Sequence, residues 1–145
     1  MSPSRNPLES PRRLDAPLYG YRAWRLRGSG LYSFSGWRAW PADSPKVALC
    51  WRNFLALGIA HHAPGSGCNC GIYAWKEPPT QPFSPQGMTP VWGVVQLWGK
   101  VVLHAAGYRS QYARPVALEY APGLEAVAAR YRVILLRTLS EWTGP

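Results

Sequence analysis

Residues 91–120 read VWGVVQLWGKVVLHAAGYRSQYARPVALEY, and this stretch decides the fold. Two runs rich in Val, Leu and aromatic residues flank a small-residue reversal at Ala105-Ala106-Gly107, which is typical of paired β-strands. Gly93 and Gly99 interrupt the first run, and glycines inside strands mark bulges or close backbone approach. The stretch therefore predicts the centre of a small, strongly bent β-sheet or barrel.

Weaker strand patterns precede this centre. Residues 19–27 (YGYRAWRLR) alternate large apolar residues with arginine, the period of a half-buried strand. Shorter strands are expected over residues 31–34 and 71–76, and residues 46–59 fit either a strand or a short helix. Five prolines make residues 77–90 a loop.

The C-terminal segment follows a helical pattern instead. Pro122 suits the first turn of a helix, and apolar residues recur at helical spacing after it. They are Leu124, Val127, Ala128, Tyr131, Leu135, Leu139 and Trp142. We expect one helix over about residues 122–142, buried against the sheet.

The predicted fold class is mainly β with a C-terminal helix (α+β). Residues 1–16 are rich in Ser, Pro and Arg and are interpreted as a disordered basic leader. Residues 17–145 then form one domain, because the chain is too short for two cores. The glycine-interrupted strand pair is similar to that of small PUA- or SH3-like barrels, a likeness of pattern that implies nothing about function.

Composition narrows the class of partner. The chain carries 16 Lys+Arg against 7 Asp+Glu, a formal net charge of +9, and thirteen of the basic residues are arginine. Arginine grips phosphate or carboxylate and stacks on rings, although a GC-rich genome produces the same bias. No apolar run approaches the roughly 18 residues of a membrane span, and no signal-peptide pattern is present. We therefore expect a cytoplasmic protein with no membrane partner.

All three cysteines and two of the three histidines lie between Cys50 and Cys70. Cys68 and Cys70 are one residue apart, and His61 and His62 precede them by six to nine positions. Soft sulfurs with one imidazole form the tetrahedral ligand set that zinc prefers. We expect one zinc ion held by the three cysteines and one histidine, and spacing does not choose between the two histidines. The alternative is a buried structural cysteine beside an incidental pair.

Two strings carry a resemblance. HxAPxxxCxCGIYA (residues 61–74) and LWGxVxxHxxGYR (residues 97–109), preceded by YRAW (residues 21–24), resemble a group of small uncharacterised proteins from actinobacteria and their phages. The resemblance covers roughly residues 19–120. It implies His61 as the ligand that joins the cysteines and implies no activity.

Signatures of catalysis are scarce. A zinc deaminase needs a glutamate two residues after its ligand histidine, and Ala63 occupies that position relative to His61. No metalloprotease, hydrolase-elbow or phosphate-loop motif is present. A filled shell of three cysteines and one histidine also leaves no open position for substrate. No catalytic residue is assigned, and a zinc hydrolase is the weakest of the functional alternatives.

Rings and guanidiniums alternate in two of the predicted strands. This pattern favours stacking on bases and gripping of phosphates, but it also fits ordinary strands with their rings inward. The candidate binding residues are Arg22, Trp24, Arg25, Trp75, Trp98, His104, Tyr108, Arg109 and Arg114. A continuous surface requires the four arginines to share one exposed face, which their odd spacing permits only where a bulge intervenes.

Two functional classes follow from these patterns. The first is a zinc-stabilised module that binds nucleic acid or a nucleobase-like ligand through arginines and aromatic rings. The second is a protein–protein interaction module for a phage or host regulatory partner, whose surface is rich in tryptophan. Eight tryptophans among 145 residues serve either class. Salt separates them, because phosphate binding weakens steeply as salt rises.

Overall fold

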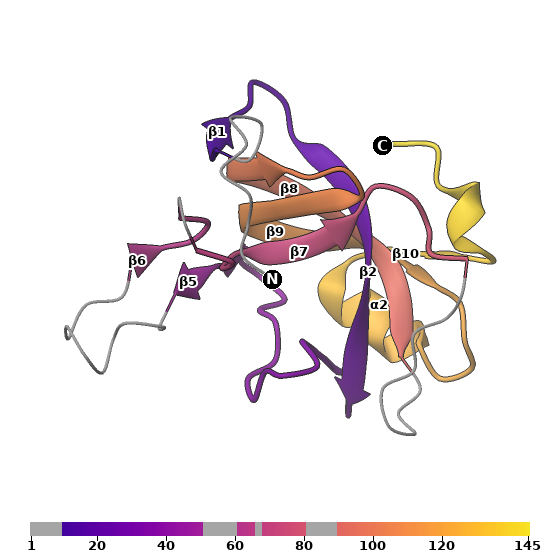
Figure 1. Ribbon diagram of the computed structural model, residues 1–145. Coiled ribbons are helices and arrows are strands. Elements are labelled where there is room, and N and C mark those ends of the chain that lie inside the picture. The colour runs from indigo at the N-terminus through magenta and orange to yellow at the C-terminus, as the bar shows by residue number, and fades with distance from the viewer. Residues whose placement is uncertain (1–9, 51–60, 66–67, 81–89) are drawn as a thin grey trace.

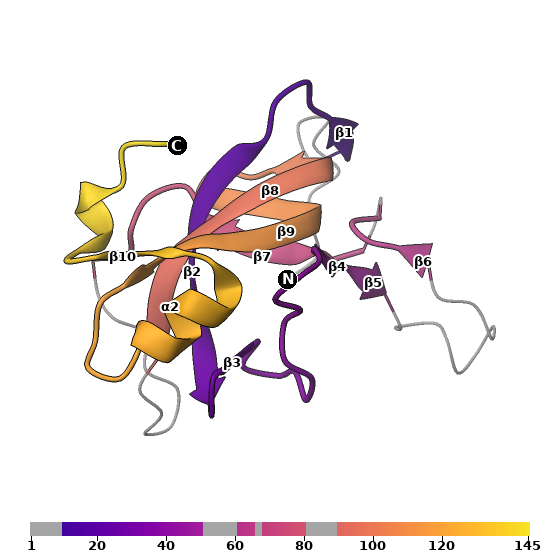
Figure 2. The same cartoon turned by 180° about the vertical axis from the view of Figure 1, so that it is seen from behind.

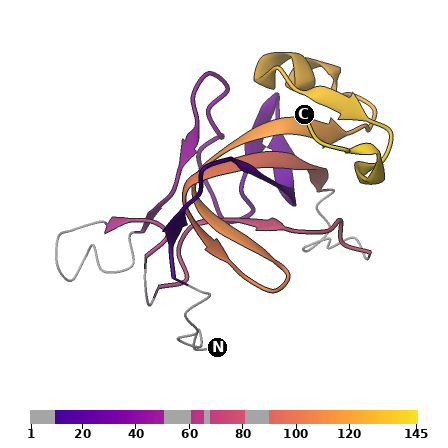
Figure 3. The same ribbon diagram turned by 90° about the horizontal axis from the view of Figure 1, so that it is seen from above.

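The computed structural model describes residues 10–50, 61–65, 68–80 and 90–145. Its centre is a bent sheet of four strands, namely β2 (Leu18–Arg27), β7 (Ile72–Trp75), β8 (Val91–Leu103) and β9 (Gly107–Glu119). β8 pairs with β2, β2 with β7, β7 with β9, and β9 with β8, all antiparallel. The pairings thus close into a small ring, which Figure 3 shows from above. The predicted mainly β fold with a strongly bent sheet is confirmed.

Short strands extend this ring. They are β1 (Arg12–Arg13), β3 (Gly30–Tyr32), β4 (Lys46–Val47) and β10 (Ile134–Leu136). A separate pair is formed by β5 (Leu49–Cys50) and β6 (His61–His62). Figures 1 and 2 show this pair on one side of the sheet, while α2 and β10 lie on the other. The expected structure over residues 51–59 lies outside the described residues.

The bend in the β8–β9 hairpin follows from its glycines. The register shifts at two places, between Val94 and Val95 and between Trp98 and Val101. Gly99 sits at the second shift with a φ of 79°, a conformation that favours glycine. A Cβ on Gly93 would lie 2.3 Å from a backbone oxygen of β9. The expected bulge and close backbone approach are therefore both present.

Apolar burial concentrates inside the sheet. Trp24 is fully buried and meets Trp40 edge to face, with ring centroids 5.4 Å apart. The Tyr131 hydroxyl joins three segments, because it donates to the Trp40 carbonyl at 2.7 Å and accepts from the Leu31 amide at 3.0 Å. A second buried cluster packs the C-terminal segment against the sheet and consists of Val94, Ala117, Leu136 and Leu139.

The C-terminal helix is shorter than expected. Helix α2 spans only Glu125–Tyr131, and it ends because Arg132 adopts the left-handed conformation (φ 55°, ψ 45°). The chain then forms β10 parallel to β9 and a single 3-10 turn, η2, at Leu139–Glu141. The predicted helix over residues 122–142 is thus wrong beyond Tyr131. No helix in the described part of the chain is long and apolar enough to cross a membrane.

The expected disordered leader is wrong at β1. Residues 1–9 lie outside the described residues, but Arg12 and Arg13 pair with Val101 and Lys100 at the end of β8. Backbone pairing needs no apolar side chain, so the composition of this segment did not indicate the strand.

Candidate metal centre and ligand groove

The three cysteine sulfurs come together. Cys50, Cys68 and Cys70 place their Sγ atoms within 4.8 Å of one another, and those of Cys50 and Cys68 are 3.4 Å apart. Tetrahedral zinc with bonds of about 2.3 Å to sulfur separates its sulfurs by about 3.8 Å. The cluster therefore has the size that a tetrahedral metal ion requires, and three close cysteines are a donor set for such an ion.

Local backbone features build this cluster. Cys50 ends β5, while the turn that carries Cys68 and Cys70 leads directly into β7. Gly71 follows the pair with a φ of 130°, and a Cβ there would lie 3.0 Å from the Cβ of Arg109. The Gly65 amide donates to the Cys70 sulfur at 3.4 Å, a contact that favours a thiolate. The turn is thus shaped by glycine on both sides.

Arg109 holds the cysteine turn from the sheet. Its side chain is only 3% exposed, and its Nη1 donates to the Cys68 carbonyl and, at 2.8 Å, to the Cys70 carbonyl. Its Nε donates to the His104 Nε2 at 3.0 Å. The expectation that Arg109 grips phosphate is therefore wrong, because the side chain is buried and its Nε and Nη1 donors are engaged within the protein. His104, another candidate ligand-binding residue, accepts the hydrogen bond from Nε and so helps to orient Arg109.

The β5–β6 register separates the two histidines. Cys50 pairs with His61, while Leu49 pairs with His62. Residues directly opposite each other in an antiparallel pair lie on the same face of the ladder. The backbone register therefore places residue His61, and not His62, directly opposite Cys50.

The thiol of Cys70 resists ionisation in the absence of metal. Burial raises its pKa to about 11, and the neighbouring Cys68 and Cys50 thiols act in the same direction, whereas the Gly65 amide opposes them. Cys70 is then a neutral thiol near pH 7. A metal that binds here must displace its proton.

The four arginines do not share one exposed face, so that expectation is wrong. Arg109 is buried, whereas Arg114 is exposed on the same strand. Arg25 donates to the Gly36 carbonyl at 2.7 Å and lies over the ring of Tyr32. The register shift at Trp98–Val101 lies opposite Gln111, between Arg109 and Arg114, and even with this irregularity Arg109 is buried and Arg114 is exposed.

The aromatic residues predicted to bind a ligand also differ in where they lie: some are buried in the core and others line a cleft. Trp24 has no exposed surface, so its place among the ligand-binding candidates is wrong. Tyr108 is partly buried against the core and lies near the Lys76 ammonium. Trp98 stacks on Tyr112 with centroids 5.9 Å apart and lines a cleft on another part of the sheet.

Strand β7 points its two aromatic side chains outward. Ile72 and Ala74 are buried, while Tyr73 and Trp75 are 51% and 50% exposed. The Tyr73 hydroxyl donates to the Asn69 carbonyl, which ties the exposed ring to the cysteine turn. The alternation of β7 thus turns one apolar face to the core and one aromatic face outward.

A groove of about 910 Å³ runs along this aromatic face. Tyr73, Trp75 and Trp92 contribute rings, while Arg22 and Lys76 contribute two positive charges against one negative charge from Glu77. Of these residues, only Arg22 and Trp75 are among the sequence-based candidates. The period-2 pattern of residues 72–75 was the signal that could have added Tyr73, because alternate residues face the same side.

Arg22 lies at the edge of the aromatic core beside this groove. Its guanidinium carbon is 4.6 Å from the ring centre of Trp40, and Nη1 donates to the Tyr73 carbonyl at 3.1 Å. Burial lowers the pKa of Arg22 to about 10, which leaves the side chain charged at neutral pH. Its Nε is buried and has no hydrogen-bond partner among the described residues.

Comparison with known protein families, curated proteins and solved structures found no match.

Proposed function

We propose that the protein is a zinc-stapled module that binds a base of single-stranded nucleic acid. The observation that carries the proposal is the juxtaposition of Tyr73 and Trp75, each half exposed, with Arg22 in one groove. Aromatic rings stack on any base, and the positive charges of Arg22 and Lys76 beside the groove attract the backbone phosphates. The net charge of +9 favours the same class of partner.

Zinc is the metal that best fits the ligand set. Three thiolates are soft donors, and His61 supplies a nitrogen from the register position opposite Cys50. Three sulfurs and one nitrogen complete a tetrahedral shell with no open position, which is typical of a structural site. The ion would therefore hold the protein in shape rather than act on a substrate.

The metal and the groove are linked through β7. Only Gly71 separates Cys70 from the start of this strand, and Tyr73 and Trp75 are two of its four residues. A metal that fixes the cysteine turn also fixes the start of β7 and the direction of both rings. Pre-positioned rings bind more tightly because they lose less conformational freedom on binding.

The zinc site is tested by exchanging one histidine at a time. We expect one equivalent of zinc in protein purified without added metal, measured by elemental analysis. His61→Ala should release the zinc, while His62→Ala, its matched control, should retain it. Zinc below about a tenth of an equivalent in the parent protein would contradict the metal assignment. The opposite order of the two variants would transfer the ligand role to His62.

The groove is tested with a fluorescent single-stranded oligonucleotide. Trp75→Ala should weaken binding about 5- to 150-fold, the range that loss of one base–ring stack produces. Trp37→Ala is the matched control, because Trp37 is 93% exposed and does not line the groove. Equal losses in both variants, or none in either, would contradict the proposal.

A salt titration separates the two functional classes. Nucleic-acid binding should weaken linearly in log–log form as salt rises, and Lys76→Ala should reduce the slope by about one unit. Exposed rings also suit a protein partner, for which Trp75 would remain important at high salt. Failure to bind the oligonucleotide at low salt would favour that protein–protein alternative.

A further inference from the structure

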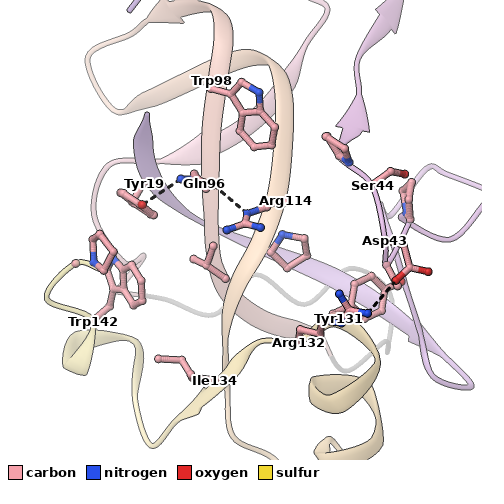
Figure 4. A pocket seen from close by; sticks show the side chains of 17 residues that line it. Tyr19, Asp43, Ser44, Gln96, Trp98, Arg114, Tyr131, Arg132, Ile134 and Trp142 are labelled. Carbon is pink, nitrogen blue, oxygen red and sulfur yellow. Dashed lines mark hydrogen bonds and ion pairs between the residues drawn. The ribbon is translucent and has the colours of Figure 1, made fainter. Parts of the chain in front are cut away.

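A second cleft, of about 720 Å³, lies on another part of the sheet. It is enclosed by β8 and β9, by the segment of residues 41–45 and by the C-terminal segment after α2 (Figure 4). None of the residues that line the aromatic groove lines this cleft. Its volume falls within the roughly 300–1,000 Å³ typical of small-molecule sites, so it suits a compact ligand.

Arg114 is held in this cleft by neutral partners. Its Nε donates to the Gln96 Oε1 at 2.9 Å, and the Gln96 amide in turn donates to the Tyr19 hydroxyl at 3.2 Å. Figure 4 shows Gln96 between Tyr19 and the guanidinium. Arg114 forms no ion pair with any carboxylate in the described part of the chain. The guanidinium is thus oriented by neutral groups and carries a charge that an outside anion could compensate.

A second guanidinium reaches the same cleft. Arg132 follows α2 in the left-handed conformation and approaches the Asp43 carboxylate at 3.8 Å. Both side chains are more than four-fifths exposed, and such surface ion pairs are weak. Arg132 can therefore exchange this partner for a more highly charged anion. With Arg114, the two arginines against one carboxylate leave a net positive charge.

Aromatic rings form the remaining walls. Trp98 lines one end of the cleft, while Tyr19 and Trp142 line another with ring centroids 5.5 Å apart. Rings and guanidiniums that face one small space match a ligand with a flat apolar part and an anionic part.

We propose that this cleft binds a nucleoside monophosphate, with the phosphate on Arg114 and Arg132 and the base against the aromatic walls. Two forked guanidiniums suit a phosphate dianion better than a single carboxylate, because phosphate offers three acceptor oxygens. The ligand is free in solution or is the phosphorylated end of a strand. This site stands apart from the proposed function and does not depend on it.

Calorimetric titration of the full chain as purified tests the site. Adenosine 5′-monophosphate should bind more tightly than adenosine and more tightly than inorganic phosphate, because each lacks one half of the recognised ligand. Arg114→Gln should weaken the nucleotide about 10- to 100-fold. Arg137→Gln removes the same charge from an exposed residue outside the cleft and should leave the affinity unchanged.

Two further measurements identify the source of the ligand and exclude binding in the aromatic groove. A short oligonucleotide with a 5′-phosphate that competes with the mononucleotide, when its unphosphorylated form does not, would identify a strand end as the ligand. Trp75→Ala should leave mononucleotide binding unchanged. Equal affinity for adenosine and its monophosphate, an unaltered affinity in Arg114→Gln, or a loss in Trp75→Ala would each overturn the proposal.

Discussion

The sheet and the cysteine region are built on different principles. Inside the sheet, residues such as Val94, Leu97 and Leu118 have no exposed surface. In the cysteine region, β5 and β6 have two residues each, and the turn is held by sulfur contacts and by hydrogen bonds from Arg109. One region is stable because it excludes water, whereas the other brings together three sulfur atoms that could hold a metal ion.

This difference assigns separate tasks to the two regions. The sheet provides a rigid base, and its strand β9 supplies the Arg109 that reaches the cysteine turn. In the proposed metal-bound protein, the cysteine region fixes the direction in which β7 begins. Perturbations of one region should therefore have measurable but unequal effects on the other.

The largest effect is expected from removal of zinc. Structural zinc contributes about 10–16 kcal/mol of apparent binding free energy in small zinc modules, so chelation should strongly destabilise this protein. Hydrogen exchange should accelerate most over residues 61–65 and 68–76 and least in β8. Cys68→Ser should reproduce the pattern. Equal loss of protection in β8 and β7 would show that the two regions unfold as one unit.

The affinity for zinc should depend on pH. The Cys70 pKa is raised to about 11 in the metal-free protein, so metal and proton compete for this sulfur over the whole neutral range. Each thiol that must lose a proton should weaken zinc binding about tenfold for every unit by which the pH falls. Competition with a chromophoric chelator between pH 8 and pH 6 measures this slope. A flat profile would contradict thiolate ligation.

A substitution that creates a cavity in the sheet should destabilise the protein without releasing the metal. Leu118→Ala removes a fully buried side chain and should lower the free energy of unfolding by about 2–5 kcal/mol. The folded variant should still carry one equivalent of zinc. Denaturant unfolding and elemental analysis give the two values. Loss of zinc from the folded variant would show that the regions are not separate.

The smallest effect is expected at the contact between the regions. Arg109→Gln leaves the Cys68 and Cys70 carbonyls without their donor, at a cost of about 1–3 kcal/mol in unfolding free energy. Zinc should also leave faster in stopped-flow transfer to a chelator. Arg114→Gln is the matched control on the same strand and should change neither value, because Arg114 is exposed. Identical behaviour of the two variants would remove Arg109 from its positioning role.

Local features such as strands and the cysteine turn were predictable from the sequence, whereas the tertiary contacts around them were not. Strands β2, β7, β8 and β9 were all anticipated, because β-branched and aromatic residues are concentrated in these runs. The approach of the three cysteines was also anticipated, since Gly71 and the short Cys-X-Cys spacing constrain the chain locally.

Tertiary context explains what could not be predicted. Residues 134–136 continue the helical spacing of α2, yet they form β10 because β9 offers them a free edge. Arg109 appeared exposed by alternation and charge, but both sides of β9 are covered where it faces the cysteine turn. Neither a neighbouring edge nor a covering loop leaves a trace in the period of one strand.

The order of the chain gives the Arg109 contact a further consequence during synthesis. Arg109 follows Cys70 by 39 residues, so at about 5–20 residues per second a ribosome adds it roughly 2–8 s later. The cysteines and both neighbouring histidines therefore leave the ribosome before the strand that secures their turn. With the proposed zinc site, the nascent chain would carry all of its metal ligands before Arg109 is added, so metal binding could precede folding of the sheet.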